Sequence, residues 1–94
     1  MLEGFAYYLA GRTEEAIAPL KRLLAQSSNH LGVHLTLAAV YSELGREAEA
    51  RAEAAEVLRI NPKFSLAVHR QRVPLKDPVV LERHLATLRK VGLK

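Results

Sequence analysis

Apolar residues recur every three or four positions along most of this chain, and glycine or proline separates one such stretch from the next. This spacing is typical of amphipathic helices, because it places the apolar side chains on one face. No window shows the strict alternation that a half-buried strand requires. The pattern therefore predicts an all-α protein with six helices, at about residues 2–10, 13–26, 30–44, 47–60, 65–73 and 78–91.

The sixth predicted helix begins with Asp77 followed by Pro78. Aspartate accepts hydrogen bonds from the free N–H groups at a helix start, and proline suits the first helical position, where no N–H donor is needed. Leu81, Leu85 and Leu88 form one apolar stripe along this helix. We expect the stripe to be buried against the fourth or the fifth helix, with the basic side chains facing water.

The first four predicted helices form two pairs, and the second pair repeats the first at the offset that separates Gly11 from Gly45. These two glycines mark the tight turn inside each pair, because glycine tolerates the left-handed backbone that often ends a helix. Small residues at equivalent positions would let paired helices approach closely, and two tyrosines would fill the gap between neighbouring pairs. The matched positions are Gly4 with Ala38, Tyr7 with Tyr41, Arg12 with Arg46, Ala16 with Ala50, Leu23 with Val57 and Leu24 with Leu58.

The repeated residues resemble the tetratricopeptide repeat, a helix pair whose period of about 34 residues equals this offset. The resemblance covers about residues 1–64 and rests on Tyr7, residues 11–16, Ala38, Tyr41, Gly45, Arg46, Ala50 and Pro62. It implies a right-handed superhelical stack of antiparallel helix pairs. We expect two such pairs in residues 1–64, the first shortened because Met1 falls inside its first helix, and the second closed by Pro62.

Residues 65–94 depart from this pattern and predict a degenerate helix pair that caps the stack. Where the second pair has small residues, this segment carries Arg72, Val79 and His84. A more polar end suits a stack of repeats, because a terminal repeat has no neighbour on its outer face. Residues 74–85 and 88–93 are also similar to the C-terminal end of bacterial proteins that join a class III adenylate/guanylate cyclase domain to a tetratricopeptide region. That similarity implies the C-terminal part of a larger regulatory protein.

Positive charge is concentrated in the last third of the chain. The total formal charge is +4, of which residues 1–64 contribute −1 and residues 65–94 contribute +5. The plain interpretation is a solvated terminal face. The alternative is a nucleic-acid-binding helical domain that uses Arg70, Arg72, Lys76, Arg83, Arg89 and Lys90. Pro74 and Pro78 interrupt the turn between its helices, and no aromatic residue lies among the charges to stack on bases, so nucleic acid is the less favoured partner.

The composition leaves little room for catalysis. The chain has no cysteine, which excludes disulfides, thiolate metal sites and cysteine nucleophiles. His30 and His34 lie one helical turn apart and could present two metal ligands, but no third ligand stands near them in the sequence. No Ser–His–Asp arrangement and no glycine-rich phosphate loop is recognisable. We therefore expect a protein that is not an enzyme, with no metal and no cofactor.

The remaining class is a module that binds protein. No apolar run of about 18 residues could span a membrane, and no signal-peptide pattern is visible, so we expect a cytoplasmic protein that does not bind membranes. In the tetratricopeptide family, the first helices of successive pairs line a concave groove that holds an extended peptide or a helix. Helical spacing places on this groove Phe5, Tyr8, Leu35, Ala39, Ser42 and His69.

This predicted groove is apolar near the N-terminus and basic only at its far end. One subset of the family clamps a peptide carboxylate with Lys, Asn and Arg, and Phe5, Tyr8, Leu35 and Ala39 are none of these, so we expect no such clamp. A large exposed apolar surface normally marks an interface. Upstream repeats or a second copy of the chain, as in a dimer, would cover it, and a separate peptide or helix is the other candidate.

Overall fold

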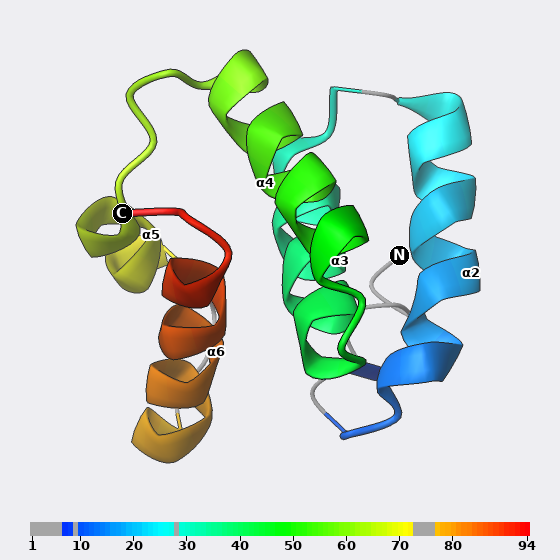
Figure 1. The fold of residues 1–94 in the computed structure, drawn as a ribbon, viewed down its shortest axis with the longest axis horizontal. Helices are drawn as coiled ribbons and strands as arrows, with labels where there is room; N and C mark the ends of the chain where they lie inside the picture. Colours follow the sequence, from blue (N-terminus) through cyan, green and yellow to red (C-terminus); the bar gives the residue numbers. More distant parts are fainter. Residues whose placement is uncertain (1–6, 9, 28, 73–76) are drawn as a thin grey trace.

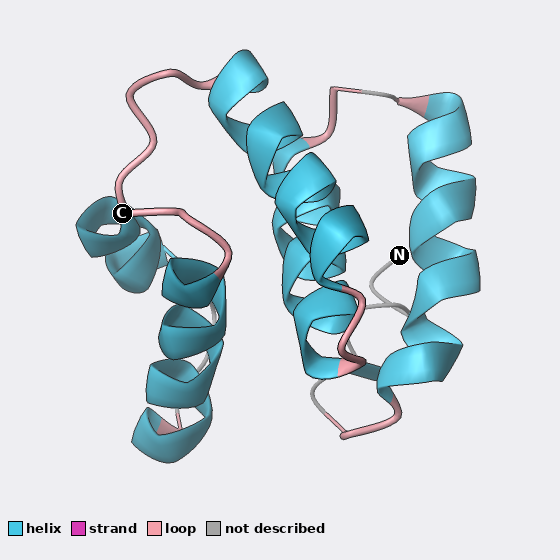
Figure 2. Cartoon of the chain, in the orientation of Figure 1, coloured by secondary structure: helices cyan, strands magenta, loops and turns pink. Residues whose placement is uncertain are grey.

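The computed structural model describes residues 7, 8, 10–27, 29–72 and 77–94, and every regular element within them is a helix (Figures 1 and 2). The labelled helices are α2 (Thr13–Gln26), α3 (Leu31–Glu43), α4 (Glu47–Ile60), α5 (Leu66–Arg72) and α6 (Pro78–Lys90). The predicted all-α stack of helix pairs is therefore confirmed. Of the first expected helix, Tyr7 and Tyr8 are described and helical, whereas Gly4 and Phe5 lie outside the described residues.

The two pairs turn in the same way. The backbone is left-handed at Gly11, with φ of +79°, and at Gly45, with φ of +76°. In the first turn the Arg12 N–H donates to the Tyr7 carbonyl at 2.8 Å, and the equivalent residues of the second pair make the same bond at 2.8 Å. A bond of this span around a left-handed glycine is a common way to end a helix. The repeat period predicted from the sequence thus corresponds to one turn geometry used twice.

The central helix of the fold is α3, and every residue from Val33 to Ser42 is buried. A helix is buried all round only where neighbours cover each of its sides. The most extensive contact is with α4, the other member of its pair, and α2 and α6 follow. Figure 1 shows α2 and α6 on opposite sides of the α3–α4 pair. The core of the protein is therefore built around α3.

The position of α6 differs from our expectation. We predicted that the stripe of Leu81, Leu85 and Leu88 would pack on the fourth or the fifth helix, but α6 packs on α3 as well as on α5. Leu85 is 3% exposed and Leu88 is fully buried. The physical reason is length: α5 has 7 residues and α6 has 13. At a rise of about 1.5 Å per residue the shorter helix cannot cover the longer one, so the rest of the stripe is buried against α3.

The C-terminal end ties α6 back to α5. Gly92 has φ of +102° and ends α6, and the N–H of Leu93 then donates to the Leu88 carbonyl at 3.3 Å. Leu93 is 1% exposed, and the carbonyl of Lys94 accepts a hydrogen bond from the N–H of Leu66 at 3.1 Å. In Figure 1 the C-terminus accordingly lies beside α5. Together α5, α6 and this return form one unit.

Candidate functional site

The small residues predicted to pack between helices are buried. Ala16, Ala38 and Ala50 expose no surface, and Tyr41 is 2% exposed. Tyr7 is partly buried against the same core. A methyl group is the largest side chain that these close approaches leave room for, because protein cores are packed without spare volume. The packing positions thus set how near α3 lies to its neighbours.

Pro62 lies in the exposed connection between α4 and α5. The helix ends at Ile60, because the residue before a proline disfavours the helical conformation. Asn61 organises the connection: its side-chain Oδ1 accepts from the Lys63 N–H at 3.2 Å, and its carbonyl accepts from the Phe64 N–H at 3.0 Å. The connection therefore changes the direction of the chain between the second pair and the α5–α6 unit.

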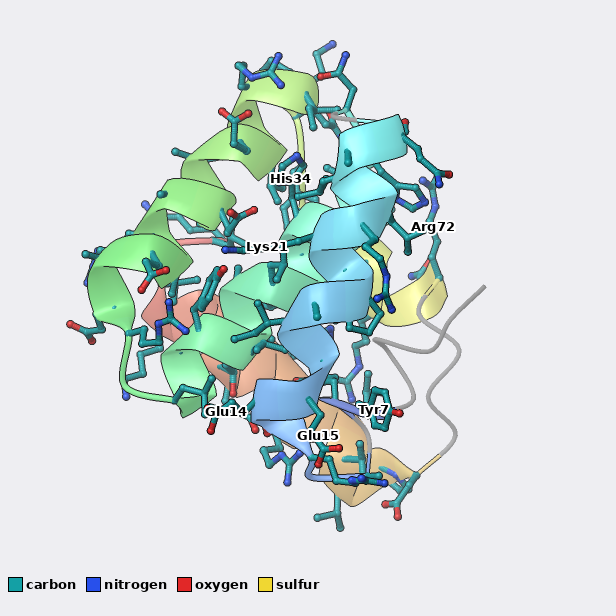
Figure 3. All side chains as sticks on the ribbon, turned by 90° about the vertical axis from the view of Figure 1, so that its right-hand side faces the viewer. Tyr7, Glu14, Glu15, Lys21, His34 and Arg72 are labelled. Atoms are coloured by element: carbon teal, nitrogen blue, oxygen red, sulfur yellow. The ribbon has the colours of Figure 1, made fainter. Side chains whose placement is uncertain are left out.

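An arginine stacks on a tyrosine at the end of each pair's first helix. The guanidinium carbon of Arg12 lies 5.1 Å from the centre of the Tyr7 ring, and its nitrogens contact both carboxylate oxygens of Glu15 at 2.8 and 2.6 Å. This ion pair raises the pKa of Arg12. Figure 3 shows Tyr7 and Glu15 at the N-terminal end of α2. The internal repeat of the sequence pairs Arg12 with Arg46 but gives neither arginine a role.

The second pair repeats this arrangement. The guanidinium carbon of Arg46 lies 4.8 Å from the centre of the Tyr41 ring, and its Nε and Nη2 atoms donate to the two carboxylate oxygens of Glu49 at 2.6 and 2.7 Å. In both pairs the glutamate follows its arginine by one helical turn. The ion pair between the guanidinium and the carboxylate therefore lies over the first turn of the next helix. Because each glutamate also sits at the positive end of that helix dipole, the arrangement supports the helix start without a side-chain cap.

The groove residues that the structure describes are covered. Their exposed fractions are 1% for Tyr8, 4% for Leu35, 0% for Ala39 and 8% for Ser42. The last three share one face of α3, because their spacing brings successive members one turn apart. Glu43 follows on the same face, and its carboxylate lies 3.8 Å from the guanidinium of Arg83 on α6. We infer from this contact that α6 lies along the predicted groove.

In this structure α6 packs on α3, and the described groove residues Tyr8, Leu35, Ala39 and Ser42 are buried. Phe5 lies outside the described residues, and His69 is half-buried on α5 with its ring directed at α6. The physical reason is that an apolar face accepts the nearest amphipathic helix, and α6 is attached to the same chain. Partner binding at these residues stays a prediction, and it requires α6 to move.

A chain of polar contacts crosses the interface between α6 and the rest of the fold. The hydroxyl of Tyr8 lies 2.8 Å from Nδ1 of His84, whose Nε2 lies 3.0 Å from Nε2 of His69. His84 is 1% exposed. Its ring meets that of Tyr8 edge-on, with the ring centres 5.6 Å apart. Side chains from the first helix, α5 and α6 thus meet at this interface.

The two imidazoles share one proton in their hydrogen bond. Of the two facing Nε2 atoms, one donates and the other accepts, because a neutral imidazole has one N–H group and one acceptor nitrogen. The Nδ1 of His84 faces the Tyr8 hydroxyl, a group that can either donate or accept, so both tautomers of His84 satisfy this contact. Every buried side-chain nitrogen and oxygen among the described residues has a partner in the same way.

Burial sets the charge state of this cluster. It raises the pKa of Tyr8 above its usual range, and the negative charge of Glu43 adds to the effect. Burial also lowers the pKa of His84 to about 4, with smaller contributions from the nearby His69 and Arg83. The pKa of His69 is lowered by burial as well. Near neutral pH the side chains of Tyr8, His69 and His84 are therefore uncharged.

Sequence reasoning found the members of this cluster without finding the cluster. It placed Tyr8 and His69 on the groove and noted His84 at a packing position, but it gave Glu43 no role. The available signal was a histidine where the repeat has alanine, with a second histidine on the preceding helix. Only the position of α6 brings the four residues together.

The other two histidines have local partners. His30 was expected to be the first residue of the third helix, but it precedes α3 as its cap, and its Nδ1 accepts from the Val33 N–H at 3.3 Å. His34 Nδ1 lies 2.6 Å from the Glu53 carboxylate on α4. Within the described ranges, no three His, Asp or Glu side chains are grouped to hold a metal ion. None of the described helices combines the length and the apolar character needed to cross a bilayer.

Two of the basic residues considered for nucleic acid face carboxylates instead. Arg70 on α5 contacts Glu82 on α6 at 3.0 Å, and Arg83 lies near Glu43. The Arg70–Glu82 ion pair joins α5 to α6, and the Arg83–Glu43 ion pair joins α6 to α3. Their cationic groups are partly neutralised, which weakens the attraction to phosphate.

The glycine turns, the stacked tyrosines and the alanine contacts, all reproduced at one offset along the chain, define an α-helical repeat protein. A family model described as tetratricopeptide repeat matches residues 7–70, and the chain belongs to this family. The match ends inside α5, so α6 lies beyond it. Comparisons with curated proteins and with solved structures found no match.

Proposed function

We propose that this chain is a non-catalytic protein-interaction module whose binding surface is the face of α3 that carries Leu35, Ala39 and Ser42, with Tyr8 at its edge. The partner that fits this surface is an amphipathic helix of another protein. The observation that supports the proposal is α6, an amphipathic helix that packs on α3 and whose Leu85 and Leu88 are buried. Membership of a helical-repeat family that commonly binds proteins agrees with it.

The proposal assigns different roles to the two parts of the chain. Residues 1–64 form the two helix pairs that build the surface, and residues 65–94 form the capping pair. A place at the C-terminal end of a cyclase fusion protein, in the cytoplasm, would suit such a module and remains part of the proposal. The nucleic-acid alternative gains nothing from the structure, because Arg70 and Arg83 face acidic side chains.

The test releases α6 from the proposed surface by substitution and then measures whether a helical peptide binds there. The variant carrying Leu85→Glu and Leu88→Glu should release α6, because both leucines are buried and a buried unpaired carboxylate is strongly unfavourable. A fluorescently labelled peptide of residues 77–94 should then bind, as measured by anisotropy. The unaltered protein should bind it much more weakly, since its attached α6 competes at an effective concentration of roughly millimolar.

Val79→Glu is the matched control, because Val79 lies on the same helix and is 77% exposed. This variant should behave like the unaltered protein. A peptide with the same two glutamates should not bind any variant. If the double variant keeps the helical signal of α2–α4 in circular dichroism and still does not bind the native peptide, the proposed surface is wrong. If the double variant loses that signal, the milder Leu88→Ala variant decides the question.

A further inference from the structure

Polar contacts, and not only apolar ones, hold α6 in place. His84 lies inside the interface and is hydrogen-bonded on both ring nitrogens, to Tyr8 and to His69. A buried polar group is strongly destabilising when it loses its partners, so this part of the interface depends on the protons that join the rings. The fit of α6 is thereby coupled to the protonation of two histidines.

Counting the protons shows what acid does to the pair. In the neutral pair one proton lies between the two Nε2 atoms, which are 3.0 Å apart. A first added proton leaves one proton between the rings but places a positive charge on an imidazole that has lost part or all of its solvation by water. A second added proton places one N–H group against another and two positive charges within a few ångströms. The closed arrangement has no place for it, whereas the exposed rings would accept both.

The charged groups around the pair do not remove this penalty. The carboxylate of Glu43 on α3 lies 3.8 Å from the guanidinium of Arg83, and its negative charge acts on Tyr8 by raising the pKa of that hydroxyl. Arg83 on α6 is itself positive and disfavours protonation of His84. The ring of His69 also lies against the uncharged ring of Phe64, with the ring centres 5.8 Å apart. The described surroundings therefore favour the neutral pair while α6 is in place.

The structure also indicates which part would move. Arg70 pairs with Glu82, and the Lys94 carbonyl accepts from the Leu66 N–H, so α5 and α6 are tied to each other. The connection of residues 61–65 joins this unit to α4. The α3–α4 pair has the most extensive helix contact in the fold and includes neither of the two histidines. The α5–α6 unit can therefore leave while the central pair stays folded.

We propose that the α5–α6 unit is a proton-released cover: near neutral pH it occupies the binding face of α3, and in mild acid it leaves and exposes that face to a partner helix. The inference rests on the proposed function for what is uncovered, but the release itself does not depend on it. The groups that act as the switch are the imidazoles of His69 and His84, with the Tyr8 hydroxyl as the partner of His84 Nδ1.

Native-state hydrogen exchange on the full chain measures the release. The opening constant of the α6 amides should rise about tenfold between pH 7.5 and pH 5.5, because the pKa of His84 is 6.5 when exposed and about 4 when buried. The opening constants of α3 and α4 should stay unchanged. Unchanged α6 opening would overturn the proposal, and so would an equal rise in every helix, which would mean global acid unfolding.

Two variants separate the pair from other histidines. His84→Gln keeps a side chain that can hydrogen-bond to Tyr8 and His69 but does not titrate, so its α6 opening should no longer change about tenfold with pH. His30→Gln removes a histidine that lies outside the interface, and it should respond to acid as the unaltered protein does. If His84→Gln and the unaltered protein respond equally, the proposed switch is wrong.

A peptide distinguishes failure of the switch from failure of the binding surface. The probe is the labelled peptide of residues 77–94 carrying His84→Gln, so that acid does not change its own interface. It should bind the unaltered full chain about tenfold more tightly at pH 5.5 than at pH 7.5, because the fraction of protein with α6 released rises by this factor. If α6 opens in acid but this peptide does not bind, the cover stands and the proposed binding surface is refuted. Binding that is equal at both pH values would overturn the cover.

Discussion

Replacing Gly45 with alanine measures how much the left-handed turn contributes to stability. The backbone at Gly45 has φ of +76°, and an added Cβ would have no other atom within 4 Å. The whole cost is therefore conformational. A residue with a Cβ in this region loses about 1–2 kcal/mol. Alanine also restricts the unfolded chain, which returns about 0.4–1 kcal/mol. We expect a net loss of about 1 kcal/mol in the free energy of unfolding.

Thermal and urea unfolding followed by circular dichroism would measure this loss. About 1 kcal/mol corresponds to a decrease of roughly 4–8 °C in Tm for a domain of this size. Gly11→Ala should cost the same, because φ there is +79° and the space around it is also empty. Gly45→Asn should cost less than Gly45→Ala, since asparagine tolerates the left-handed region better. Gly32→Ala, in the first turn of α3, is a comparison without left-handed backbone: its added Cβ would lie 3.3 Å from Cε1 of the capping His30, so the shift of that ring reduces the helix-propensity gain of up to about 1 kcal/mol.

Three outcomes would contradict this reasoning. A loss well above about 3 kcal/mol for Gly45→Ala would mean that the added methyl group meets other atoms, contrary to the open space at this turn. No loss at all would mean that the turn is not left-handed. Clearly different losses at Gly11 and Gly45 would mean that the two helix pairs do not end their first helices in the same way.

Further predictions concern the acid response, the core and the surface. The pKa of His84 is 6.5 when exposed and about 4 when buried, so between these values the unfolded state binds more protons than the folded state. The free energy of unfolding is therefore highest above pH 6.5 and falls by about 3 kcal/mol as the pH approaches 4. Urea unfolding at a series of acid pH values should show this loss, and His84→Gln should remove it. Leu88→Ala should cost about 2–5 kcal/mol in the same assay, because Leu88 is fully buried, whereas Val79→Ala should change stability by less than about 0.5 kcal/mol. Arg46→Lys should lower stability only slightly, because the ion pair of Arg46 with Glu49 is exposed to water, and added salt should reduce the difference.

Features that depend on one residue's own backbone preference could be predicted from the sequence. Asp77 accepts from the Val79 N–H at 2.9 Å, as its place before Pro78 indicates. The turns at Gly11 and Gly45 follow from the need for a residue without Cβ. The position of α6 was not predictable in this way, because several apolar faces compete for one amphipathic helix. Which face is covered depends on helix lengths and on the path of the connection, which are properties of the whole fold.

The same limit applies to the polar cluster, and it explains what kind of interface this is. Tyr8 and His84 are 76 residues apart in the sequence, so no local pattern could join them. A cap that only had to stay in place would be served best by apolar residues, since replacing buried polar groups with apolar ones of similar shape is often neutral or stabilising. His84 stands at the position where the repeat has alanine, and the attachment of α6 depends on whether its imidazole is protonated. That cost in stability is reasonable for a cover that has to leave, and it gives a permanent cap no advantage.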